Sequence, residues 1–130
     1  MKELVIKKCL KCGALVEVLE DCTCDNCGIK CCGEEMKKLE PNTVDAAKEK
    51  HIPQYEIADN QIIVKVDHEM KEDHFIEWLA LSANNKIGKK FLLPNNNPVA
   101  IFPYAEGSII YAYCSKHGLW SNKVTKEENR

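Results

Sequence analysis

Five residues outside the cysteine-rich N-terminus carry side chains that can bind a transition metal. They are His51, His68, His74, Cys114 and His117. Cys114 stands three residues before His117, a separation that lets both side chains reach one ion from a loop that leaves a strand. Imidazoles and a thiolate are ligands that iron, zinc and copper prefer. A single histidine is more often structural, but the shared placement of these five at strand ends and in loops predicts a mixed nitrogen–sulfur metal site.

The remaining seven cysteines lie between Cys9 and Cys32. The motif Cys-x-x-Cys-Gly occurs twice there, and two intervening residues let both sulfurs reach one tetrahedral ion. An adjacent cysteine pair follows the second motif. Two metal-binding quartets are therefore open: Cys9, Cys12, Cys24 and Cys27, which spacing alone favours, and Cys9, Cys12, Cys31 and Cys32. A disulfide framework fits poorly because the chain shows no secretion signal.

The composition limits the classes of partner. The chain has 130 residues, of which 45% are hydrophobic and 29% charged, as in globular proteins. A formal net charge of -2 argues against broad electrostatic binding to nucleic acid or to an acidic membrane surface. No apolar run approaches the ~20 residues that span a bilayer. We therefore expect a cytoplasmic protein with reduced cysteines and no nucleic-acid or membrane partner.

The cysteines also divide the chain into unequal parts. We predict a metal-binding module over residues 1–37, a polar linker over residues 38–48 and a larger domain over residues 49–130. The module has too few large apolar residues to build its own core, so metal binding is expected to supply the missing folding free energy.

The larger domain is predicted to be mainly β. Apolar residues alternate along residues 61–67, so Ile62, Val64 and Val66 share one face of a strand. Residues 75–83 are apolar on much of both faces, and residues 108–114 are rich in β-branched and aromatic types. Short strands separated by polar turn clusters predict a β-sandwich or a barrel.

Several of these motifs, taken in order, resemble one known family. "EKHIP" (residues 49–53), His68, "HFIEW" (residues 74–78) and "YCSKHGLW" (residues 113–120) follow a module with an adjacent cysteine pair. In that arrangement the chain resembles the desulfoferrodoxins, the two-iron form of superoxide reductase, over essentially its whole length. The resemblance implies a small desulforedoxin- or rubredoxin-like module followed by an immunoglobulin-like β-sandwich.

The resemblance also implies an activity. Family members reduce superoxide by one electron to hydrogen peroxide, a chemistry that protects an anaerobe without releasing dioxygen. The four histidines would form the equatorial plane of a non-haem iron, and Cys114 would be the axial thiolate that pushes electron density through the metal. Lys50 would draw superoxide in and donate a hydrogen bond, and Glu49 would close over the open sixth position once the iron is ferric.

For the N-terminal module, the resemblance reverses the preference from spacing. It implies a second iron, or zinc in recombinant protein, and the ligands would be Cys9, Cys12, Cys31 and Cys32. Three further cysteines then have no assigned role: Cys22, Cys24 and Cys27. The resemblance also implies a rubredoxin or a similar small redox protein as electron donor, and a homodimer.

The sequence also allows two functions other than the enzyme. A rubredoxin-like electron carrier would need only the N-terminal metal, but it leaves the four histidines unexplained. A zinc-ribbon module that binds nucleic acid would fit the paired Cys-x-x-Cys motifs, but the slightly acidic net charge counts against it.

Overall fold

A computed structural model describes residues 3–25 and 28–126 of the chain. These residues form strands and one short 3-10 helix, η1 (Lys48–Lys50). They divide into two compact units, one that spans residues 4–40 and a larger one that consists chiefly of residues 41–126. The first unit therefore extends three residues beyond the predicted end of the module at residue 37. In the described ranges, no helix has the length and apolar character that crossing a membrane requires.

The Leu4–Glu40 unit consists of short antiparallel strands. They are β1 (Ile6–Lys8), β2 (Leu15–Glu17), β3 (Lys30–Cys31), β4 (Glu34–Glu35) and β5 (Lys37–Lys38). β1 lies between β2 and β5, and β3 pairs with β4 in a separate hairpin. Four apolar side chains besides Cys9 are buried in the unit: Leu4, Ile6, Val18 and Met36. A core of this size is expected to depend on a cross-link or a metal.

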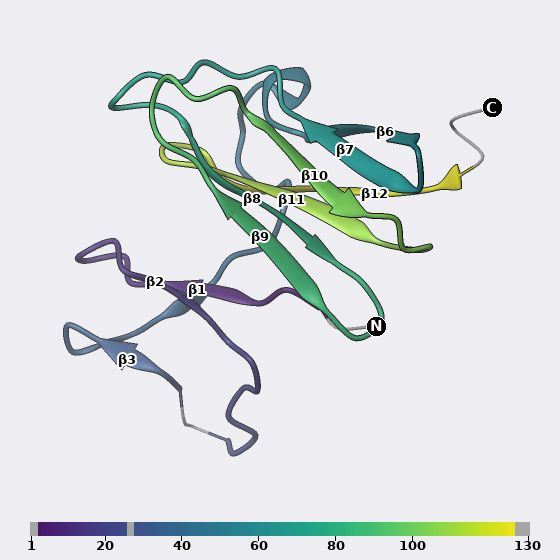
Figure 1. The fold of residues 1–130 in the computed structure, drawn as a ribbon. Coiled ribbons are helices and arrows are strands. Elements are labelled where there is room, and N and C mark those ends of the chain that lie inside the picture. Colours follow the sequence, from purple (N-terminus) through teal and green to yellow (C-terminus); the bar gives the residue numbers. More distant parts are fainter. Residues whose placement is uncertain (1–2, 26–27, 127–130) are drawn as a thin grey trace. The chain divides into compact units, whose positions relative to one another are not determined.

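The larger unit is a sandwich of two antiparallel sheets (Figure 1). Its strands are β6 (Gln54–Ala58), β7 (Gln61–Lys65), β8 (Ile76–Ser82), β9 (Ile87–Phe91), β10 (Val99–Pro103), β11 (Ile109–Cys114) and β12 (Gly118–Lys123). One sheet has the order β10-β7-β6 and the other the order β12-β11-β8-β9. The prediction of a mainly β chain with a sandwich domain is confirmed.

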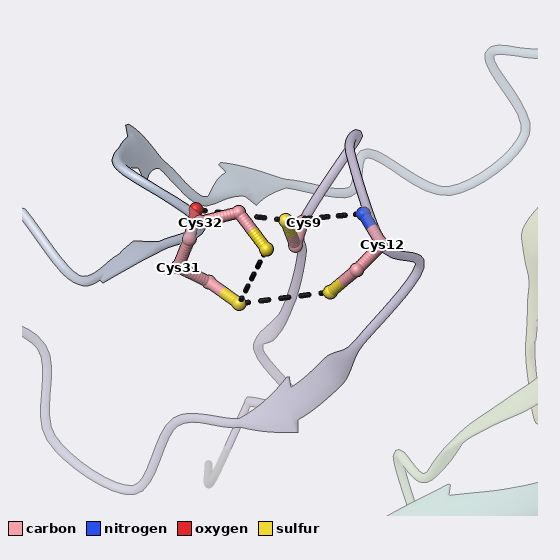
Figure 2. A group of neighbouring side chains, drawn as sticks. All are labelled: Cys9, Cys12, Cys31 and Cys32. Carbon is pink, nitrogen blue, oxygen red and sulfur yellow. Dashed lines mark hydrogen bonds between the residues drawn. The ribbon is translucent and has the colours of Figure 1, made fainter.

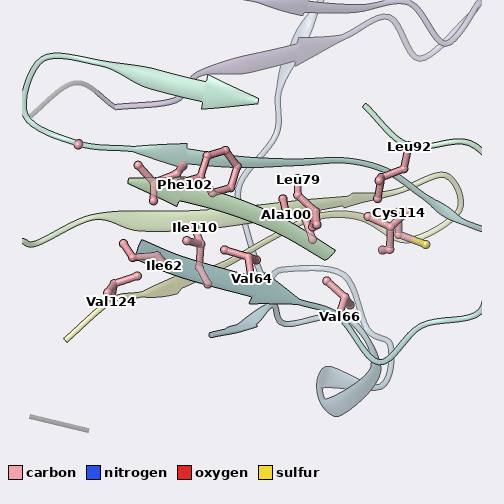
Figure 3. Packing of buried hydrophobic residues seen from close by; sticks show 14 residues of the cluster. Ile62, Val64, Val66, Leu79, Leu92, Ala100, Phe102, Ile110, Cys114 and Val124 are labelled. Carbon is pink, nitrogen blue, oxygen red and sulfur yellow. The ribbon is translucent and has the colours of Figure 1, made fainter. Parts of the chain in front are cut away.

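The core of the sandwich lies between the two sheets (Figure 3). Ile62 and Val64 on β7 are fully buried, as the alternating pattern predicts, and β8 is buried along nearly its whole length. On β11, alternate residues Ile110, Ala112 and Cys114 belong to the core cluster. Because side chains alternate along a strand, the pattern that buries Ile110 also directs the thiol of Cys114 into the interior.

Truncating Ile110 to alanine is expected to destabilise the sandwich by about 2–5 kcal/mol, since its side chain is fully buried between the sheets. The loss should appear as a lower midpoint in denaturant unfolding followed by circular dichroism. Ile101→Ala is the matched control: Ile101 is 57% exposed on β10, and its loss should change stability by about 0.5 kcal/mol or less. Equal effects of the two substitutions would contradict this account of the core.

Candidate metal centres

His51 is held in place by η1 and by an aromatic neighbour. Its backbone N–H donates to the carbonyl of Lys48 at 3.1 Å, which closes the 3-10 turn. Its ring Nδ1 donates to the carbonyl of Ala47 at 2.7 Å, and the ring stacks on the indole of Trp120 with centroids 4.9 Å apart. With Nδ1 used in this way, Nε2 of His51 is the nitrogen left to face the other histidines.

His68 and His74 lie on the loop that joins β7 to β8. Nδ1 of His68 donates to the backbone carbonyl of Glu69. Nδ1 of His74 lies 2.6 Å from the side-chain carboxylate of the same Glu69. Nε2 of His74 is buried and has no hydrogen-bond partner among the described residues. A buried polar atom without a partner is costly, so this nitrogen indicates a site for a ligand that accepts its lone pair.

Cys114 and His117 are joined by the turn between β11 and β12. Cys114 pairs with Gly118, whose φ of 78° is a conformation that glycine adopts without strain. The register between β11 and β8 shifts at Cys114, which faces Ile76, while the preceding residue faces Trp78. This bulge lies at the end of β11 that carries the fully buried thiol. Bulges commonly redirect side chains near functional sites.

The four imidazoles form a closed ring above the thiol. Neighbouring ring centroids are separated by 4.9 Å (His51–His68), 4.5 Å (His68–His74), 5.1 Å (His74–His117) and 4.8 Å (His51–His117). The diagonal His51–His74 is longer, at 6.4 Å. Sγ of Cys114 lies 3.3 Å from Nε2 of His68 and 3.8 Å from Nδ1 of His117. The arrangement is a quadrilateral of nitrogen donors with a sulfur donor against it.

The distances within this cluster fit a bound metal ion. Two nitrogens at right angles around a metal, each about 2.1 Å from it, are about 3.0 Å apart. Nε2 of His51 and Nδ1 of His117 are 3.0 Å apart. Ligand atoms of His51, His74, Cys114 and His117 all lie within 4.8 Å of one another, and His68 adjoins the thiol. The four-histidine, one-cysteine set therefore fits iron.

Burial shifts the pKa values of His68, His117 and Cys114. It lowers the pKa of His68 and of His117, and for His117 the nearby His51 and His74 lower it further. Both rings are therefore held in the neutral form that binds a metal. Burial raises the pKa of the Cys114 thiol, so a metal that binds there must displace its proton.

An open pocket of about 490 Å³ gives access to the histidines. It is lined by Asp45, Ala46, Ala47, Lys50, His51, Asp67, His68, Glu69, His74 and His117. Nζ of Lys50 lies 3.3 Å from a carboxylate oxygen of Asp67, and both side chains are exposed. Glu49 is exposed on η1 and does not belong to the lining. The lining thus carries one lysine and three carboxylates.

The second cluster lies in the Leu4–Glu40 unit and consists of Cys9, Cys12, Cys31 and Cys32 (Figure 2). Their sulfurs all lie within 4.8 Å of one another. Sγ of Cys31 is 3.7 Å from that of Cys12 and 3.9 Å from that of Cys32. Four converging thiols form the donor set of a tetrahedral metal site.

The adjacent cysteines converge because they occupy a tight turn. Cys32 and Gly33 connect β3 to β4 and have φ values of 55° and 77°, as in a type I′ turn. The preceding Cys31 is still in the extended conformation of β3. This change of backbone conformation between neighbours turns both sulfurs toward Cys12, although adjacent side chains on a regular strand would point apart.

The hydrogen bonds around the sulfurs shift the pKa values of Cys9, Cys31 and Cys32. The backbone N–H of Cys12 lies 3.5 Å from Sγ of Cys9 and lowers the Cys9 pKa to about 7. Side-chain hydrogen bonds, chiefly with Cys12, raise the pKa of Cys31 to about 12 and also raise that of Cys32. A metal must therefore displace protons from the adjacent pair, so its apparent affinity is expected to rise with pH.

The three unassigned cysteines do not join this cluster in the part of the chain that the structure describes. Cys22 is an exposed free thiol, but Cys24 is disulfide-bonded, contrary to the expectation of reduced cysteines. Cys27 lies outside the described residues. The structure thus brings together the quartet that the resemblance implies, rather than the one that spacing favours.

Comparison with known proteins agrees with this geometry. The desulfoferrodoxin family model matches residues 43–123. The desulfoferrodoxin of Syntrophotalea carbinolica is 44% identical over 94% of this chain and 98% of its own length. The chain belongs to the desulfoferrodoxin family. The desulfoferrodoxin of Nitratidesulfovibrio vulgaris, another relative, is 43% identical over 88% of this chain and 92% of its own length.

Solved structures of superoxide reductases share the fold. The enzyme from Treponema pallidum superposes with a TM-score of 0.70 at 31% identity, covering 93% of this chain and 99% of its own. A one-iron superoxide reductase from Giardia intestinalis gives a TM-score of 0.53 at 28% identity, covering 59% of this chain and 98% of its own. The similarity to the Treponema protein therefore spans both units, and the two donor sets match the iron centres of this family.

Proposed function

We propose that this desulfoferrodoxin is a superoxide reductase that works at the four-histidine, one-cysteine cluster. The reaction adds one electron and two protons to superoxide and yields hydrogen peroxide. The observation that carries the proposal is the closed ring of four imidazoles, set against a buried thiol and opening onto a pocket. Iron bound at this cluster would supply the electron.

The protein groups around the cluster have separate tasks in this proposal. The neutral imidazoles would hold the metal without cancelling its charge, and the thiolate of Cys114 would donate electron density to it. Among the described residues that line the pocket, Lys50 is the one lysine or arginine, so it attracts the superoxide anion and donates a hydrogen bond to it. Glu49, exposed on η1 next to Lys50, is the carboxylate that would close the pocket in the oxidised protein.

The second cluster is assigned a supporting task. Iron held by Cys9, Cys12, Cys31 and Cys32 would relay electrons and stabilise the Leu4–Glu40 unit. A rubredoxin or a similar small redox protein would supply the electrons. The protein itself would be a homodimer in the cytoplasm. In an anaerobe, such a reaction removes superoxide without producing dioxygen.

A superoxide pulse with simultaneous dioxygen detection tests the activity. The reduced protein should consume superoxide without releasing dioxygen, and metal analysis should find two irons per chain. A rubredoxin-like carrier would instead contain one iron and would leave superoxide untouched. Release of dioxygen would show dismutation and would also reject the proposal.

The ion pair between Lys50 and Asp67 offers a second test, because Asp67 offsets the cation that attracts the substrate. Lys50→Met is expected to lower the second-order rate constant with superoxide by about tenfold, and Asp67→Asn to raise it by a few-fold. The rate constants should be measured by pulse radiolysis over a range of ionic strength. The Asp67→Asn rate should fall more steeply with added salt, since uncompensated positive charge is screened.

The control for this charge effect is Glu56→Gln. Glu56 forms an exposed ion pair with Lys65 at 3.7 Å, and neither residue belongs to the lining of the histidine pocket. Glu56→Gln removes one negative charge and therefore changes the net charge by the same amount as Asp67→Asn. If the two variants accelerate the reaction equally, the effect comes from total charge and not from the Lys50–Asp67 pair.

A further inference from the structure

Glu69 directly follows His68 on the loop that joins β7 to β8, and it contacts two of the clustered histidines, His68 and His74. Its backbone carbonyl accepts from Nδ1 of His68. Its carboxylate oxygen Oε2 lies 2.6 Å from Nδ1 of His74, and Oε1 lies 3.7 Å from Nζ of Lys71. Each carboxylate oxygen thus has its own partner, and the pair with His74 is the shorter of the two.

The acceptor for the outer nitrogen of His74 is charged, whereas the acceptors for His51 and His68 are neutral. His51 and His68 each donate from Nδ1 to a neutral backbone carbonyl. His74 instead donates to a carboxylate, and its opposite nitrogen, Nε2, is the buried atom without a partner. A carboxylate on the outer N–H fixes the tautomer of a metal-binding imidazole and makes its other nitrogen a stronger donor.

The loop holds Glu69 in this position through its backbone. The N–H of Lys71 donates to the carbonyl of His74, and the N–H of His74 donates back to the carbonyl of Lys71, at 3.1 and 3.0 Å. Met70 is fixed on both sides, since its carbonyl accepts from Asn95 at 2.8 Å and its sulfur accepts from the N–H of Ile76 at 3.4 Å. The carboxylate therefore reaches His74 from a constrained loop.

We propose that Glu69 is a positioning residue that orients His74 and strengthens its donation to the iron of the superoxide-reducing site. The negative charge stabilises the ferric more than the ferrous state, and so Glu69 lowers the reduction potential of that iron. The inference rests on the proposed iron site but assigns a function to a residue outside the ligand set. Glu69 acts through His74 and does not contact the substrate.

Glu69→Gln separates charge from orientation, because the amide oxygen still accepts from His74 while the negative charge is lost. A redox titration of the iron-loaded full chain is expected to show a higher reduction potential in this variant. A tenfold change in the ratio of ferric to ferrous affinity corresponds to 59 mV for a one-electron couple, and we expect a shift of about this size. Glu69→Ala also removes the hydrogen bond that orients His74. The affinity of this variant for ferrous iron, measured by competition with a chelator, should fall about 10–100-fold.

The matched control is Glu72→Gln, which removes the same charge from the same loop at an exposed residue. The Glu72→Gln variant should have the same iron reduction potential and the same iron affinity as the unmodified protein. If Glu69→Gln also leaves the potential unchanged, or shifts it no more than Glu72→Gln does, the proposal for Glu69 is wrong while the iron site stands. If the unmodified chain binds no iron at the histidines, both the site and this inference fail.

Discussion

Replacing Cys114 with serine is expected to abolish superoxide reduction. The side chain is fully buried against the ring of histidines, with Sγ 3.3 Å from Nε2 of His68. A serine hydroxyl keeps its proton at neutral pH and donates far less electron density to a metal than a thiolate does. We expect the rate constant with superoxide to fall at least about 100-fold, a loss of about 2.7 kcal/mol of transition-state stabilisation.

This expectation can be checked by pulse radiolysis together with visible spectroscopy of the oxidised protein. The charge-transfer band that the Cys114 thiolate gives to ferric iron at the histidine cluster should disappear along with the activity, while the bands of iron bound by the four N-terminal cysteines should remain. Cys22→Ser is the control, since Cys22 is an exposed free thiol outside both clusters, and it should change neither measurement. Full activity of the Cys114→Ser protein would remove the thiolate from the mechanism.

Removing the metal from the N-terminal cluster is expected to unfold the Leu4–Glu40 unit while the sandwich stays folded. The unit buries few apolar side chains, and its strands are only two or three residues long. Metal binding to comparable small structural sites is worth about 10–16 kcal/mol, which exceeds what such a core supplies. The sandwich has a core cluster of its own, drawn from both sheets.

Amide hydrogen exchange resolves the two units separately. In a Cys31→Ser protein, or after chelation at the N-terminal cluster, protection should be lost in β1 and β2 and kept in β8 and β11. Cys22→Ser should keep protection in all four strands. Persistent protection of β1 and β2 without metal would mean that the apolar core of this unit suffices.

The sequence allowed the sandwich to be predicted from its most regular strands. On β7, Ile62 and Val64 share the buried face, while Gln61, Ile63 and Lys65 are exposed or half-buried on the other. β8 is instead a short, nearly continuous apolar run, which is typical of a strand that is buried on both faces. β9 had no such signal: its sequence IGKKF contains a glycine and two lysines, and it lies at the edge of its sheet. Edge strands are buried on fewer sides, so their patterns specify less.

The types of the metal-binding residues could be predicted from the sequence, but the turn and the carboxylate that position them could not. The order of histidines and the Cys114–His117 pair pointed to the family, and the structure gathers these residues. The spacing of the cysteines did not reveal the turn at Cys32 and Gly33, and it favoured Cys24 and Cys27 as ligands instead. The glycine after the adjacent cysteines was the available signal for that turn. The role of Glu69 depends on which way a loop carboxylate points, and sequence carries no periodicity for that.

The positions of the two clusters along the chain have a consequence for biosynthesis. All four ligands of the N-terminal cluster lie within the first 32 residues, whereas the histidine cluster also needs Cys114 and His117, near the C-terminus. Domains tend to fold in order as they leave the ribosome, N-terminal parts first. The first metal can therefore bind while translation continues, but the histidine cluster can take up its iron only after residues 114–117, about 80 residues further along the chain, have emerged.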